Sequence, residues 1–304
     1  MSDLQNPIFH DETKAREWLE SQVWPDGPYC PHCGSVDCTT LKGKAHRPGL
    51  YQCNDCRQQF TVTVGTLIER SKIPLSKWLM ATYILCASKK GMSTRQLSRM
   101  LSVSVKSSWF MMHRIRESMR ESKTGPLGGA NKVVEVDETF VGGKARNKAF
   151  GDPPKKEPVV ALVERDGSVR AFHVEAVSQR TLRPILTREI DRASYLMTDE
   201  ATYYRRIGRE YSGHGTVIHS IKEYVRGGFW HTNTVESYFA ILKRGITGNY
   251  QWVSAKHLKR YLGEFDFRYN TRDVTDFERA AIAAKGIQGK RLTYRRTGER
   301  QARQ

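Results

Sequence analysis

The most informative segment of the chain is Lys132-Val-Val-Glu-Val-Asp137, an apolar-rich run that predicts a strand ending at an acid. A second short strand, Tyr195-Leu-Met-Thr-Asp199, is predicted to end in the same way. A third acid, Glu236, lies in the first turns of an amphipathic helix predicted over Thr232–Arg244. Acids so placed can hold two divalent cations about 4 Å apart, which clamp the attacking and leaving oxygens of a phosphodiester. The alternative for each acid is a solvated residue in a turn.

The elements around these acids predict one mixed sheet. Two strands, Pro158–Val163 and Val169–Val174, are joined by a turn at Arg165-Asp-Gly167 and should form an antiparallel meander with the Asp137 strand. The remaining elements are, in order, a helix over Thr181–Asp191, the Asp199 strand, a short strand near Thr216–His219 and the Glu236 helix. The order β-β-β-α-β-α-β-α is that of the ribonuclease H-like fold, of class α/β (α+β). In that fold the first and fourth strands are neighbours at the sheet centre, and their acids meet the acid on the late helix.

Composition indicates a polyanionic partner. The chain has 304 residues, enough for two or three domains, and 50 Lys and Arg against 32 Asp and Glu give a formal net charge of +18. Because each neutralised phosphate releases condensed counterions, this charge favours nucleic acid. An anionic membrane is the competing explanation, but no apolar run approaches the ~20 residues of a spanning helix, and the first residues lack the pattern of a secretory signal. We therefore expect a soluble intracellular protein that binds nucleic acid and no membrane.

Four of the six cysteines predict a structural zinc site. Cys30-Pro-His-Cys33 and Cys53-Asn-Asp-Cys56 are two C-x2-C knuckles separated by 19 residues. Four thiolates leave no open coordination position, so one Zn²⁺ held there is structural and not catalytic. Cys38 and His32 are weaker candidates, because neither has a partner at knuckle spacing. Cys86 lies in an apolar helix and is expected in the core.

The residues around the knuckles predict a small domain that depends on its metal. Alternating runs at Gly49–Cys53 and Gln59–Val64 predict short hairpins, and a short helix is predicted over Asp11–Ser21. Because few apolar residues are present, zinc binding should supply much of the folding free energy.

The segment from Pro74 to about Glu121 is predicted to be helical. The predicted helices cover Trp78–Ser88, Thr94–Leu101 after the capping residue Ser93, and, beyond a turn at Ser102–Ser104, a segment to about Arg120. The last two resemble a helix-turn-helix, whose second helix enters the major groove by its N-terminal residues. The candidate groove contacts are Ser104, Lys106, Ser107 and Ser108. A helical hairpin without a DNA-binding role is the alternative.

Six motifs in a specific order carry a family resemblance. They are Trp24-Pro-Asp-Gly-Pro28 with Cys30-Pro-His-Cys-Gly34, Lys72-Ile-Pro-Leu75 before Trp78, Val136-Asp-Glu-Thr-Phe-Val-Gly-Gly-Lys144, His231-Thr-Asn-Thr-Val-Glu-Ser237, Leu242-Lys-Arg-Gly245 and Arg268-Tyr-Asn-Thr-Arg272. Over nearly its whole length, from about Phe9 to Arg295, the chain resembles the insertion-sequence DDE transposases of the ISXO-like family with an N-terminal zinc ribbon.

The resemblance implies a prokaryotic, cytoplasmic enzyme that acts on chromosomal or plasmid DNA. Such an enzyme uses two Mg²⁺ or Mn²⁺ ions to cleave double-stranded DNA at the terminal inverted repeats of a mobile element. It then transfers the 3′-hydroxyl ends to target DNA. A homodimer or higher oligomer on the DNA is expected.

The resemblance also implies roles for individual residues. Asp137 and Asp199 become two catalytic metal ligands, in agreement with the strand pattern. Similar transposases carry Glu or Asn at the third position, and this chain has both Glu236 and Asn233, one helical turn apart. Because a carboxylate is the better ligand for a hard cation, we predict Glu236 as the ligand and Asn233 as a supporting residue that caps the helix. Lys243, two turns after Glu236 on the same face, matches a phosphate-contacting lysine, and the adjacent Arg244 is a further DNA-binding candidate.

Other acids and other functions remain alternatives. The acids that chemistry alone does not separate from the two aspartates are Glu135, Glu138, Glu200, Asp273 and Asp276. His231 could carry a proton or contact phosphate, but we expect it to pack in a loop with Phe229 and Trp230. A transcription regulator with a zinc ribbon and a helix-turn-helix would need no converging acids, and a nuclease of the same fold would hydrolyse DNA without joining it.

The sequence predicts four regions. Residues 1–73 form the N-terminal helix and zinc ribbon, 74–124 the helical DNA-binding domain, 132–283 the catalytic domain and 284–304 a basic tail. The tail, rich in glycine and basic residues over Gly286–Arg296, is expected to be disordered without DNA.

A late helix is predicted over Leu258–Tyr269. We expect it to pack on the sheet through Leu258, Tyr261, Leu262 and Phe265, and to expose its arginines to DNA.

Overall fold

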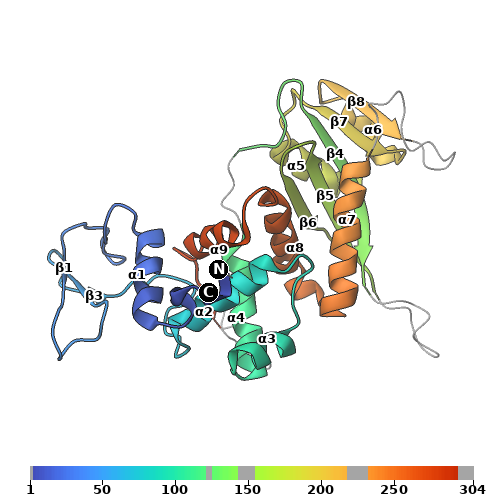
Figure 1. The fold of residues 1–304 in the computed structure, drawn as a ribbon. Helices are drawn as coiled ribbons and strands as arrows, with labels where there is room; N and C mark the ends of the chain where they lie inside the picture. The colour runs from blue at the N-terminus through green and yellow to red at the C-terminus, as the bar shows by residue number, and fades with distance from the viewer. Residues whose placement is uncertain (1–2, 121–124, 143–154, 218–231, 294–304) are drawn as a thin grey trace, which may run out of the picture. The chain divides into compact units, whose positions relative to one another are not determined.

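The computed structural model describes residues 3–120, 125–142, 155–217 and 232–293, and the chain divides into two compact units (Figure 1). The first unit contains Met1–Arg120 and Val274–Gln304, and the second contains Glu121–Asp273. The helix α9 (Asp276–Lys285) therefore belongs to the first unit, although the predicted catalytic domain extends to residue 283.

The N-terminal part of the first unit is a helix followed by a small sheet. Two 3-10 turns, η1 (Asp3–Gln5) and η2 (Pro7–Phe9), precede α1 (Glu12–Val23). The carboxylate of Asp11 starts α1 by accepting the N–H groups of Thr13 at 2.7 Å and Lys14 at 3.0 Å. The antiparallel strands β1 (Cys38–Thr40), β2 (Tyr51–Cys53) and β3 (Gln59–Phe60) follow. The third strand ends before the predicted Val64, because the chain turns there with a bond from the Val64 N–H to the Thr61 carbonyl.

The rest of the first unit is helical. It contains α2 (Leu75–Ala87), α3 (Thr94–Leu101), α4 (Val105–Ser118) and the late helix α9. Ser93 caps α3 as predicted, accepting the N–H of Gln96 at 3.2 Å. The predicted burial of Cys86 is also confirmed.

Part of the basic tail is ordered against this unit. The carbonyl of Ile287 accepts the N–H of Leu67 at 3.1 Å, and the ammonium of Lys290 donates to three carbonyls at the end of α4, including that of Arg120 at 2.6 Å. The expectation of disorder is therefore wrong for residues 286–290, and residues 294–304 lie outside the described part of the chain.

The second unit is built on a five-stranded mixed sheet. Its strands are β4 (Val133–Val141), β5 (Glu157–Glu164), β6 (Val169–His173), β7 (Tyr195–Asp199) and β8 (Gly213–Val217), in the spatial order β6-β5-β4-β7-β8. The first three form the predicted antiparallel meander, and β7 runs parallel to both β4 and β8. The prediction that β4 ends at Asp137 is wrong, because residues to Val141 continue the ladder with β5.

Helices cover both faces of this sheet (Figure 1). On one face, α5 (Gln179–Glu189) and α6 (Thr202–Gly208) pack against the even-numbered residues of β4, such as Val134 and Val136. On the other face lie α7 (Asn233–Gly245), its π-helical extension η5 (Ile246–Tyr250) and α8 (Ala255–Asn270). The predicted order of elements is confirmed, and β4 and β7, the first and fourth strands, are neighbours.

The predicted packing of α8 on the sheet is confirmed for Leu258, Leu262 and Phe265, which belong to the core cluster that contains β5 and β6 residues. Tyr261 is buried as well, with its ring 4.7 Å from that of Tyr250 in η5. The expectation of exposed arginines fails for Arg268, whose side chain is only 9% exposed because it pairs with the buried carboxylate of Glu264.

Candidate active site and metal centre

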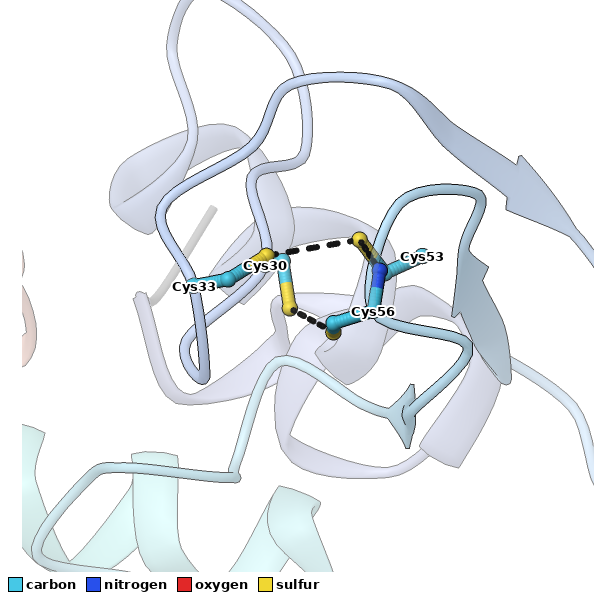
Figure 2. Close-up of side chains that lie close together, drawn as sticks. All are labelled: Cys30, Cys33, Cys53 and Cys56. Atoms are coloured by element: carbon cyan, nitrogen blue, oxygen red, sulfur yellow. Dashed lines mark hydrogen bonds between the residues drawn. The ribbon is translucent and has the colours of Figure 1, made fainter.

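The four knuckle cysteines meet at one point from two separate loops (Figure 2). The Sγ atoms of Cys30 and Cys56 are 3.6 Å apart and those of Cys33 and Cys53 are 3.5 Å apart, and all four sulfurs lie within 4.8 Å of one another. Tetrahedral zinc with Zn–S bonds of about 2.3 Å places sulfurs about 3.8 Å apart. The donor set and its spacing therefore fit one structural Zn²⁺.

A local hydrogen bond favours the thiolate form of Cys53. The N–H of Cys56 donates to the Cys53 sulfur at 3.5 Å, and this bond is the main cause that lowers the pKa of Cys53 to about 7. Cys38 stays outside the cluster, with its sulfur 3.5 Å from the Ser35 carbonyl oxygen.

In the second unit, Asp137 and Asp199 follow the paired parts of two neighbouring strands. The parallel pairs between β4 and β7 run from Val133↔Tyr195 to Glu135↔Met197, and each aspartate lies two residues beyond the last pair. The negative charges of both aspartates act on the same carboxyl, that of Glu138. Neighbouring strands lie about 4.8 Å apart, and residues in register project from the same face. Both aspartates are half-buried, so their carboxylates are within reach of solvent and of a ligand.

Glu236 lies in α7, the helix that packs on one face of this sheet through its apolar residues. It is exposed in the first turn of the helix, and its Oε1 accepts the hydroxyl of Thr232 at 3.1 Å. The three acids are not as compact as the cysteine cluster, the group whose ligand atoms all lie within 4.8 Å among the described residues.

The prediction that Asn233 caps α7 is wrong. Asn233 is the first residue inside the helix and is exposed, and Thr232, the residue before it, forms no cap through its side chain. The carboxylate of Glu135, on β4, caps the helix instead. It accepts the N–H groups of Thr234 at 2.9 Å and Val235 at 3.0 Å.

The two competing acids closest to Asp137 in sequence have structural partners. Glu135 is fully buried and also pairs with the Nε of Arg165 at 2.7 Å. Glu138 points to the opposite face, where it accepts the hydroxyl of Tyr204 at 2.7 Å and that of Tyr203. Burial raises the pKa of Glu138 to about 7, and the negative charges of Asp199 and Asp137 add to this rise against the opposing bond from Tyr204.

The remaining competing acids lie away from this cluster or in solvent. Glu200 is exposed, and the Asp273 side chain is 84% exposed. Asp276 is in the first unit, where it pairs with Arg279. His231 lies outside the described residues.

The predicted DNA contacts are placed as follows. Ser104 is exposed and caps α4 by accepting the N–H of Ser107 at 3.1 Å, and Lys106 is exposed beside it. Ser108 is fully buried and donates to the Thr94 carbonyl at 3.0 Å, so its prediction as a groove contact is wrong. The remaining two candidates, Lys243 and Arg244, are exposed in the last turn of α7.

Two family models match the chain. Residues 126–270, which include the three acids, match the ISXO2-like transposase domain. Residues 10–59, which include the four cysteines, match the transposase zinc-ribbon domain. The chain is also 27% identical over 282 residues to a protein of Halobacterium salinarum described as an uncharacterized protein in transposable element ISH50. That alignment covers 86% of this chain and 91% of the relative. Among the described residues, no helix has the length and apolar character to span a membrane.

We predict that Cys53→Ser releases zinc and destabilises the ribbon. Removing one of four ligands opens the tetrahedral site, and the small sheet loses the metal that holds its loops together. The measurement is zinc per chain after dialysis, together with proteolysis of residues 24–60. Cys38→Ser is the matched control, because Cys38 lies in the same ribbon outside the cluster. Equal zinc content in both variants would contradict the assignment.

Proposed function

The chain belongs to the ISXO2-like transposases of insertion sequences, and from this premise we propose that it cleaves the ends of a mobile element and transfers the 3′-hydroxyl ends to target DNA. The observation that carries the proposal is the register of β4 and β7, whose last parallel pair, Glu135↔Met197, lies two residues before both Asp137 and Asp199. Glu236, at the start of α7, is the third acid of the proposed site.

The three carboxylates supply the oxygen donors that Mg²⁺ or Mn²⁺ prefers. Two cations held by Asp137, Asp199 and Glu236 would activate the attacking oxygen and offset charge on the leaving oxygen. The protein's own task is to hold the acids in place and to orient the scissile phosphate. Lys243 and Arg244 are exposed in the last turn of α7, and we propose that they contact phosphates of the bound DNA.

Recognition of the DNA ends is assigned to the first unit. We propose that α3 and α4 act as a helix-turn-helix, since Ser104 and Lys106 are exposed and Ser107 is half-buried at the start of α4. The ribbon would support this recognition, and the net charge of +18 would supply sequence-independent attraction to phosphate.

One assay separates the proposed function from its alternatives. A labelled duplex carrying the terminal repeat is incubated with the protein, a plasmid target and Mg²⁺ or Mn²⁺. A transposase yields label joined to the plasmid, whereas a nuclease of the same fold yields shortened duplex alone. A transcription regulator binds the duplex and leaves it intact.

Asp137→Ala and Asp199→Ala are each expected to abolish cleavage, to below a few per cent of the wild-type rate in Mg²⁺. DNA binding should persist, because the lost charge repels phosphate and both side chains are only half-buried. Cleavage rate and duplex affinity at one fixed salt concentration are the measurements. Glu200→Ala is the control, since Glu200 follows Asp199 and is exposed. Substantial cleavage by either aspartate variant would refute the assigned pair.

We predict that Glu236→Gln eliminates cleavage in Mg²⁺, with slight recovery in Mn²⁺. Only a carboxylate offsets the charge of the cation at this position. Asn233→Ala should retain cleavage and most of its stability, because Glu135 and not Asn233 caps α7. The reverse ranking of the two variants in the same assay would assign the third position to Asn233.

A further inference from the structure

We infer, building on the proposed function, that Glu135 and Glu138 are positioning residues for the catalytic acids. Glu135 fixes the helix that carries Glu236, and Glu138 fixes the segment that follows Asp199. Both project from β4 on either side of Asp137 in the sequence. One strand therefore provides a proposed ligand together with two carboxylates that contact α7, which bears Glu236, and α6, which follows Asp199.

The contacts of Glu135 anchor the start of α7. The first N–H groups of a helix have no partner within it, and the helix dipole favours a negative charge there. Glu135 satisfies the N–H groups of Thr234 and Val235 and also accepts the Thr234 hydroxyl at 3.0 Å. Glu236 follows directly after these residues. Glu135 and Asp137 are two residues apart on β4. The buried Glu135 carboxylate therefore connects the strand that bears Asp137 to the start of the helix that bears Glu236.

Glu138 provides an equivalent anchor on the opposite face. Its carboxylate accepts the hydroxyls of Tyr203 and Tyr204, which lie in the first turn of α6. Tyr204 is fully buried, so its ring cannot move without disturbing the core. Between β7 and α6, the Oδ1 of Asp199 accepts the N–H of Ala201 at 3.1 Å. The short connection from Asp199 to α6 is therefore fixed by the Asp199 carboxylate at its start and by the Glu138–tyrosine bonds at its end.

Such anchors matter because catalysis is sensitive to small displacements. A misplacement of about 1 Å costs on the order of 100-fold in rate. Partners that orient metal ligands typically change metal affinity or activity by about 10–100-fold when they are removed.

The test compares Glu135→Gln and Glu138→Gln with Glu189→Gln in the full-length protein. Glutamine keeps the volume but removes the charge and one acceptor oxygen. Glu189 is a matched control because it is 1% exposed, pairs with Arg170 and Arg188, and lies in α5 of the same unit. Tyr204→Phe is a second, milder variant, which removes one hydroxyl and keeps every charge and the ring.

The readouts are Mn²⁺ affinity from the electron paramagnetic resonance signal of free Mn²⁺, the cleavage rate, and the melting temperature. Glu135→Gln and Glu138→Gln should weaken Mn²⁺ binding about tenfold or more and slow cleavage about 100-fold. Tyr204→Phe should act in the same direction to a smaller extent. Glu189→Gln should lower the melting temperature at least as much and leave Mn²⁺ affinity unchanged.

Mn²⁺ affinity and cleavage within about threefold of the control in both glutamine variants would overturn the inference. Asp137→Ala in the same titration separates this failure from failure of the proposed site. If Asp137→Ala loses Mn²⁺ binding and the two glutamine variants do not, the positioning roles are refuted and the proposed metal site stands. Wild-type Mn²⁺ binding by Asp137→Ala refutes the proposed site itself.

Discussion

The parallel pairing of β4 with β7 is the constraint on which the candidate site depends. Residues in register on neighbouring strands share a face, and Asp137 and Asp199 each lie two residues beyond the pair of Glu135 with Met197, so continued register would bring them to the same face. A slip of one residue would turn one aspartate to the opposite face and remove the pair. Leu196 of β7 is fully buried in the core on the side of α5 and α6, and such a slip would displace it from that core.

Glu135, Asp137 and Glu138 lie within four residues of β4, and three carboxylates so close together would repel one another if all were charged in the same surroundings. The structure gives each a different environment. Glu135 is offset by Arg165 and by the N-terminus of α7, and Glu138 is offset by two tyrosine hydroxyls. Asp137 is half-buried, and its Oδ1 accepts the N–H of Glu138 at 2.8 Å. In a protein with a formal charge of +18, this local negative charge is suited to cations that accompany a DNA phosphate.

Local patterns in the sequence were sufficient for the elements and the metal cluster. The strand Tyr195–Asp199 and the helix Thr94–Leu101 have the predicted bounds, since apolar periodicity and a capping serine determine them locally. Knuckle spacing likewise identified the four cysteines that come together.

Contacts between distant residues could not be predicted in the same way. The cap of α7 comes from Glu135, about a hundred positions earlier, so the local candidate Asn233 was the wrong choice. Ser108 shares a polar segment with Ser104, but the helix face that it occupies is buried. Burial of Arg268 depends on Glu264, and the order of the tail near Lys290 depends on carbonyls at the end of α4.

The central claim is that Asp137 and Asp199, and not the neighbouring glutamates, face the catalytic cation. Its most direct test is a crystal structure of the protein with Mn²⁺ and a terminal-repeat duplex, in which anomalous scattering locates the ion. We predict an ion within about 2.0–2.6 Å of carboxylate oxygens of both Asp137 and Asp199, with Glu135 still on the N-terminus of α7. An ion bound by Glu135, Glu138 or Glu200 in place of either aspartate would contradict the account.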